Sequence, residues 1–172
     1  PKRSLSQAVR PEMEALARET GESVNLAVPL GREALYLDQV EGTKLVRLFT
    51  APGSRAPLHA TGVGKVFLAY LGVPEGLSLT PYTPHTLTRL PDLLRELEAV
   101  RGRGYALDNE EKELGVRCVA APVFGASGGV VAALSLSAPA SRLSLEEAHR
   151  LAPRVVEAAR RASLRLGYTG EV

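Results

Sequence analysis

Two apolar runs separated by a short glycine-rich segment constrain the fold of this chain more than any other feature. Residues 116–124 and 130–137 are rich in Val, Ala and Leu, and the five residues between them read Gly-Ala-Ser-Gly-Gly. Short apolar runs bounded by glycines are typical of two β-strands joined by a turn. The sequence therefore predicts a β-hairpin over this stretch.

One face of the predicted hairpin carries polar groups. Because side chains alternate along a strand, Ser135 and Ser137 share one face with small residues, whereas the opposite face is wholly aliphatic. With the turn centred near residue 127, the only cysteine, Cys118, is expected roughly opposite Ser135. A hydroxyl buried without a partner costs about 1–3 kcal/mol. A bound ligand would supply that partner, so we expect a pocket for a small polar molecule, with Asp108 of the preceding acidic segment nearby.

The remaining sequence predicts helices on either side of further strands. Thr61 can cap one helix, Pro91 suits the first turn of another, and Ser144 with Glu147 forms a capping box for the last. Helices are expected near residues 4–21, 62–71, 90–102 and 144–166, and strands near 23–30, 34–40, 44–50 and 105–108. Strands grouped between terminal helices predict an antiparallel α+β sheet, and the length predicts a single domain over residues 1–172.

Composition excludes several classes of protein. A hydrophobic content of 45% with 23% charged residues describes an ordinary globular domain. No apolar run approaches the roughly 18 residues of a membrane span, and no signal-peptide pattern opens the chain. One cysteine rules out an internal disulfide framework and is typical of a reducing cytoplasm. The net charge of +2 is too small to indicate nucleic acid binding.

Three motifs, in this order, resemble one family. They are Leu58-His-Ala-Thr-Gly-Val-Gly-Lys65, then Asp108-Asn-Glu-Glu111 followed by Gly115 and Cys118, then Ser135-Leu-Ser137. Together they resemble the effector-binding domain of IclR-type bacterial transcriptional regulators, and the resemblance covers essentially the whole chain. It implies a GAF/profilin-like domain, a sensor that forms homodimers or homotetramers. No winged helix-turn-helix is recognisable, so DNA contact is expected only through a separate N-terminal domain.

The resemblance also implies a site for a small organic acid. Backbone N–H groups of Gly62 and Val63, with Ser135 and Ser137, would bind the effector carboxylate. Asp108 would accept a hydrogen bond from a hydroxyl or hydrated carbonyl, and Cys118 would line the wall. Apolar walls are expected from Leu45, Leu48 and Ala56, the last replacing a bulkier side chain in many family members. No cofactor, metal or catalytic residue is expected.

Other interpretations of these residues stay open. The glycines around Lys65 do not form a phosphate loop, because His59 and Val66 occupy the positions that need glycine and a hydroxyl residue. The glycines could serve only a tight turn, Asp108 could merely cap the acidic turn, and Cys118 could be a core residue. Glu110 and Glu111 are expected to be solvated or to pair with Lys112 and Arg117.

Three further functions are weaker alternatives. A metal site would combine Asp108, Cys118 and His59, each an acceptable ligand type. An enzyme would use Cys118, but the three histidines are scattered and no nucleophile–base pair is evident. The domain could also be an assembly module whose pocket stays empty.

Overall fold

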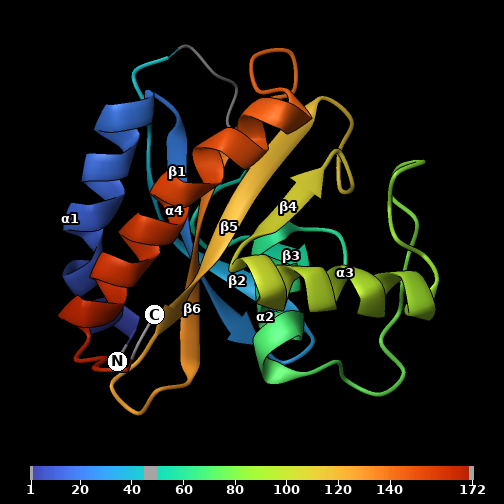
Figure 1. Ribbon diagram of the computed structural model, residues 1–172, viewed down its shortest axis with the longest axis horizontal. Coiled ribbons are helices and arrows are strands. Elements are labelled where there is room, and N and C mark those ends of the chain that lie inside the picture. Colours follow the sequence, from blue (N-terminus) through green and yellow to red (C-terminus); the bar gives the residue numbers. More distant parts are fainter. Residues whose placement is uncertain (1, 45–49, 171–172) are drawn as a thin grey trace.

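The computed structural model describes residues 2–44 and 50–170 of the chain (Figure 1). Within these residues, six strands form one antiparallel sheet in the order β3-β2-β1-β6-β5-β4. The strands are β1 Ser23–Leu30, β2 Glu33–Val40, β3 Arg55–Pro57, β4 Ala106–Asn109, β5 Val116–Phe124 and β6 Val130–Pro139. The helices are α1 Lys2–Thr20, α2 Gly62–Leu71, α3 Leu90–Arg103 and α4 Leu145–Arg165. The predicted antiparallel α+β architecture is confirmed.

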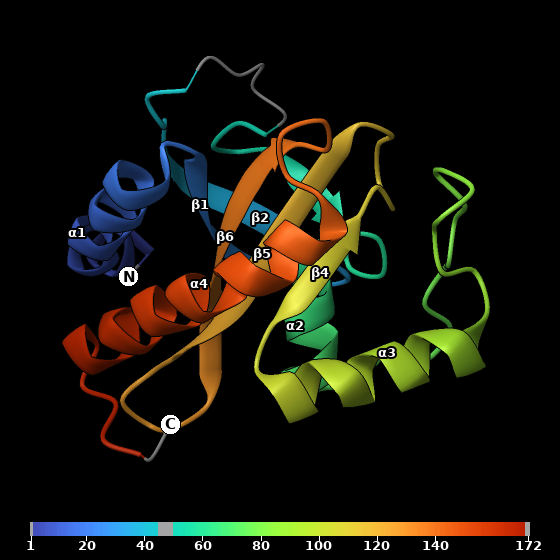
Figure 2. The ribbon, with the colours of Figure 1, turned by 45° about the horizontal axis from the view of Figure 1, so that its top comes forward.

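Helices cover both faces of the sheet. Helices α1 and α4 lie together on one face, and α2 and α3 cover the other (Figures 1 and 2). The α1/α4 side is packed with aliphatic residues from every second position of the strands, such as Val119, Leu134 and Leu136. No helix within the described ranges is long and apolar enough to cross a membrane.

One predicted strand cannot be compared with the structure, and one predicted strand pairing is wrong. The expected strand at 44–50 falls largely on residues 45–49, outside the described residues, whereas the short edge strand β3 was not predicted. In the hairpin, Cys118 lies opposite Ser137, and Ser135 lies opposite Ala120. The predicted pairing of Cys118 with Ser135 is therefore wrong by two residues. The register shifts between Val123 and Phe124, a β-bulge that a symmetric turn does not anticipate.

Helix α2 is held close to the sheet at its first turn. Thr61 is its N-cap, and the Thr61 side chain accepts a hydrogen bond from the Gly64 N–H at 3.1 Å. A Cβ on Gly64 would lie 2.5 Å from the backbone of Leu58, and one on Gly62 would lie 3.1 Å from the Ala120 Cβ. Glycine is needed at these positions for close approach, so the helix begins directly above β5.

Candidate functional site

The strand register aligns the predicted polar residues in adjacent rows across the sheet. One row runs through Ser23, Ser137, Cys118 and Asp108 on β1, β6, β5 and β4. The next row runs through Gln39, Asn25, Ser135 and Ala120, on β2, β1, β6 and β5. All lie on the face covered by α2 and α3, since their strand neighbours pack against α1 and α4.

Most of these groups are enclosed by the protein. Asp108, Ser135 and Ser137 are 3%, 2% and 6% exposed. Val63 at the start of α2 is also buried, and Cys118 is partly exposed. Polar side chains at this depth need hydrogen-bond partners.

A buried asparagine supplies partners for both serines. The Nδ2 of Asn25 donates to Ser137 Oγ at 3.2 Å and to Ser135 Oγ at 3.4 Å. Its Oδ1 accepts from Gln39 Nε2 at 2.9 Å and from Thr50 Oγ1 at 2.8 Å. The two serines are therefore held at one side of a network that spans β1, β2 and β6.

The first turn of α2 presents backbone donors to the same face. Gly62 and Val63 are the first two helical residues, and N–H groups at these positions have no intrahelical partner in any α-helix. The next N–H, that of Gly64, already donates to the side-chain oxygen of the N-cap residue Thr61. The start of a helix also carries a partial positive charge, so these two N–H groups suit an anion.

Asp108 caps the acidic turn and is unusually easy to protonate. Its Oδ1 accepts a hydrogen bond from the Glu111 N–H at 2.8 Å, as the simple capping interpretation predicted. Burial, reinforced by the charge of Glu111, raises the pKa of Asp108 to about 7. Near neutral pH this carboxyl can therefore either donate or accept a hydrogen bond.

A buried ion-pair network lies between α2 and the acidic turn. The Lys65 side chain is fully buried, and its Nζ lies 2.9 and 3.1 Å from the two Glu111 carboxylate oxygens and 2.9 Å from Glu96 Oε2. Burial alone would lower the pKa of Lys65, but the two carboxylates outweigh it and the pKa is raised. The expectation that Glu111 is solvated or pairs with Lys112 or Arg117 is thus wrong.

The partner expected for Glu110 is confirmed. Glu110 Oε2 lies 3.1 Å from Arg117 Nη2. The two glutamates of the motif therefore have different partners, one on β5 and one on α2.

Cys118 has the surroundings of an unreactive thiol. Its Sγ lies 3.2 Å from Ser137 Oγ. Burial, with the nearby charge of Asp108, raises the pKa of the Cys118 thiol well above its ordinary value. Because the thiolate is the nucleophile, these surroundings do not favour covalent chemistry.

The remaining predicted wall residues are only partly covered by the structure. Leu45 and Leu48 lie outside the described residues. Ala56 is buried on β3 and belongs to the same apolar cluster as Tyr36 and Val63. No group of three His, Cys, Asp or Glu side chains within residues 2–44 and 50–170 could hold a metal ion. His59 instead lies with its Nε2 2.8 Å from the Thr80 carbonyl oxygen.

Sequence reasoning missed the polar residues of β1 and β2. Ser23, Asn25 and Gln39 complete the rows described above. The sequence signal was the alternation of polar and apolar residues in Ser23-Val-Asn25-Leu. The structure adds that both polar side chains are buried, which is uncommon for these residue types. A buried asparagine in a strand indicates a polar network.

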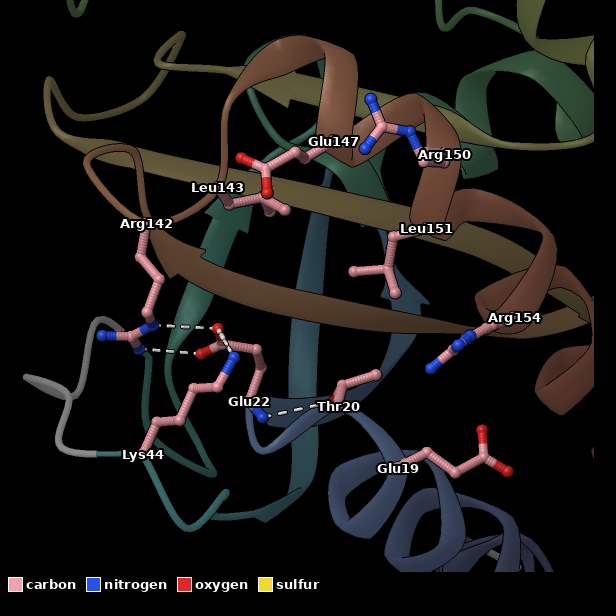
Figure 3. A pocket seen from close by; sticks show the side chains of 10 residues that line it. All are labelled: Glu19, Thr20, Glu22, Lys44, Arg142, Leu143, Glu147, Arg150, Leu151 and Arg154. Carbon is pink, nitrogen blue, oxygen red and sulfur yellow. Dashed lines mark hydrogen bonds and ion pairs between the residues drawn. The ribbon is translucent and has the colours of Figure 1, made fainter.

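A concave region of about 310 Å³ lies elsewhere, between the end of α1 and the first turns of α4 (Figure 3). Arg142 donates to both carboxylate oxygens of Glu22, at 3.0 and 2.8 Å, and Lys44 reaches the same carboxylate at 3.4 Å. Arg154 points into this groove and, among the described residues, makes no hydrogen bond or ion pair. None of the predicted effector-binding residues lines the groove, but Arg154 makes it a competing place for an anion.

Comparison with known proteins supports one assignment. The family model described as "Bacterial transcriptional regulator IclR C-terminal" matches residues 2–164. The HTH-type transcriptional regulator BhcR of Paracoccus denitrificans is 39% identical over 165 residues, which are 92% of this chain and 59% of BhcR. This chain thus spans about three-fifths of that relative's length.

Two solved structures of transcriptional regulators have a fold similar to that of this chain. The Thermotoga maritima IclR structure has a TM-score of 0.87 at 35% identity, covering 95% of this chain and 69% of that one. A double mutant of the PobR inducer-binding domain from Acinetobacter, in complex with 3-hydroxybenzoic acid, has a TM-score of 0.82 at 26% identity. The match covers 91% of this chain and 96% of that one. These relatives are transcriptional regulators rather than enzymes, as expected for this chain.

Proposed function

Because the chain belongs to the IclR family of bacterial transcriptional regulators, as the effector-binding domain, we propose that it senses a small organic acid on the α2/α3 face of its sheet. The acid would lie over β5 and β6, between the first turn of α2 and Asp108. The PobR complex with 3-hydroxybenzoic acid supports a carboxylic acid as the ligand class.

The observation that carries this proposal is that buried donors from α2 and β6 lie on the same face of the sheet. The N–H groups of Gly62 and Val63 and the hydroxyls of Ser135 and Ser137 belong to one face and are withdrawn from bulk water. A carboxylate removed from water loses strong solvation, and several charge-assisted hydrogen bonds are needed to replace it. Four donors of this kind can satisfy both carboxylate oxygens.

Asp108 would recognise the rest of the effector. With a pKa near 7, it can accept a hydrogen bond from an effector hydroxyl or, when protonated, donate one to a carbonyl. The side chains of Cys118 and Ala56 would form uncharged parts of the pocket wall. The site would therefore select acids with a second oxygen function a short distance from the carboxylate.

In the intact regulator, the effector would favour one arrangement of the subunits over another. Ligands shift a conformational equilibrium only through different affinities for its states. We propose that this domain assembles as a dimer or tetramer. Its effector-bound state would change the affinity of a separate DNA-binding domain for its operator in the cytoplasm.

The test is thermal unfolding of the domain against a panel from glyoxylate and pyruvate to 3-hydroxybenzoate. An acid at about 100 times its dissociation constant adds roughly 2.7 kcal/mol, a rise in melting temperature of several degrees. The shift should disappear in the Ser135→Ala/Ser137→Ala double mutant and persist in Arg154→Ala, which removes the exposed cation of the opposite groove. The reverse pattern would move the site to that groove. No shift with any acid would favour an assembly module.

A further inference from the structure

Asn25 is the polar residue most deeply involved with the two serines, although neither motif spacing nor the family resemblance pointed to it. It is 1% exposed and is the third residue of β1, directly opposite Ser135. Its two amide ends face different partners. If the amide oxygen faced the serines, both hydroxyls would have to donate to Asn25. If the amide nitrogen faces them, both hydroxyls can donate to another group.

The orientation of the amide follows from a group that can only accept. Gln39 Nε2 lies 3.1 Å from the backbone carbonyl oxygen of Thr50, so this end of Gln39 must be its NH₂ group. The same nitrogen lies 2.9 Å from the Asn25 side chain, which must therefore present its oxygen there. The nitrogen of Asn25 is thus the end that faces Ser135 and Ser137.

This orientation determines what the serines can offer a ligand. Each serine oxygen accepts a hydrogen bond from Asn25 Nδ2, so neither hydroxyl hydrogen is needed to satisfy Asn25. The Ser135 hydrogen is left for a ligand. That of Ser137 is shared between a ligand and the Cys118 sulfur, which lies 3.2 Å away.

A further hydroxyl supports the same conclusion. Ser23 is the cross-strand neighbour of Ser137 and is 5% exposed, and its Oγ has no hydrogen-bond partner among the described residues. A buried hydroxyl without a partner is costly unless something else satisfies it. Ser23 therefore adds a third hydroxyl beside those of Ser135 and Ser137 that can donate to a ligand.

We propose that Asn25, oriented by Gln39, fixes Ser135 and Ser137 as hydrogen-bond donors and so selects a carboxylate over a neutral head group, with Ser23 as a third hydroxyl at this site. The inference rests on the proposed effector site and adds a residue that determines its specificity. Asn25 acts through the serines, so it is a positioning residue.

The decisive variant is Asn25→Asp, which has the same shape but the opposite hydrogen-bonding polarity. Gln39 and Thr50 can still donate to the new carboxylate, so the network stays satisfied. Both serines must now donate to residue 25, and a negative charge faces the effector carboxylate. The chain's other asparagine provides the matched control, since Asn109→Asp makes the same change where Arg117 already donates to the side chain.

The readout is the ratio of affinities for an acid and its neutral amide, which a general loss of stability does not change. Pyruvate with pyruvamide, and 3-hydroxybenzoate with 3-hydroxybenzamide, are titrated calorimetrically at pH 8, with formate as the smallest carboxylate. Asn25→Asp should weaken acid binding by about 100-fold or more, because like charges repel strongly in a buried site. The acid-to-amide preference should fall at least about tenfold, which is ~1.4 kcal/mol. Asn109→Asp should keep the wild-type preference.

Each outcome separates the two proposals. If the wild type binds an acid and Asn25→Asp keeps its preference, the role of Asn25 is overturned and the effector site survives. If the wild type binds no carboxylate, formate included, both proposals fail. If Asn25→Asp does not fold, Asn25→Ala is measured instead. Its freed serines should lower the preference by several-fold, and an unchanged preference would contradict the inference.

Discussion

Replacing Lys65 with methionine tests whether the buried ion-pair network holds the acidic turn in place. Methionine keeps most of the length and apolar stem of lysine but removes the charge. The change leaves Glu111, whose side chain is 9% exposed, without its ammonium partner. Glu96 is 24% exposed and still has Arg103 Nη2 at 3.6 Å, so the loss falls mainly on Glu111.

The expected magnitude follows from burial. Removing one partner of a buried ion pair costs about 3–5 kcal/mol, because the remaining charge stays desolvated without compensation. Glu111 would keep the Asn109 N–H at 3.0 Å, which can offset only part of this. For a domain of this size, about 2–4 °C per kcal/mol corresponds to a melting temperature lower by roughly 6–20 °C.

Urea unfolding at pH 8 measures the effect, in a cycle of Lys65→Met, Glu111→Gln and the double variant. The double variant should be markedly more stable than Lys65→Met, because residue 111 then carries no buried charge that lacks a partner. A Lys65→Met variant that loses less than about 1 kcal/mol would refute the reasoning. So would a double variant no better than the single one.

Two further predictions concern stability. Asp108 keeps its proton up to about pH 7 in the folded state but loses it near pH 3.9 when unfolded, so stability should fall as pH rises between these values. Asp108→Asn removes this dependence. In urea unfolding, the variant should be as stable as the wild type at pH 4 and more stable by up to about 4 kcal/mol at pH 8. A gain in stability confined to acid pH would contradict the raised pKa of Asp108. Gly64→Ala should destabilise by about 3 kcal/mol, because its Cβ would meet the Leu58 backbone, and Gly62→Ala by less, since it meets only the Ala120 Cβ. Gly102→Ala is the control, because its Cβ would meet open space, and it should be neutral or slightly stabilising. Equal melting temperatures for the three alanine variants would argue against close packing of α2 on the sheet.

The sequence by itself determined the features that depend on near neighbours. Capping by Thr61 and by Ser144 with Glu147 was predictable, because a cap joins residues three positions apart. The shared face of Ser135 and Ser137 was predictable too, because strand alternation is a property of the backbone. The hairpin and the α+β class follow from the same local patterns.

Only the tertiary structure decided how these pieces meet. The bulge between Val123 and Phe124 shifts the pairing by one residue and so places Cys118 opposite Ser137 rather than Leu136, and no local preference specifies it. Asn25 lies 110 residues from Ser135, so their hydrogen bond depends on β1 pairing with β6. Lys65 and Glu111 meet across 46 residues because α2 packs on the sheet. A sequence states which polar groups exist, but their partners are fixed by close packing of distant segments, where each buried group must find a partner.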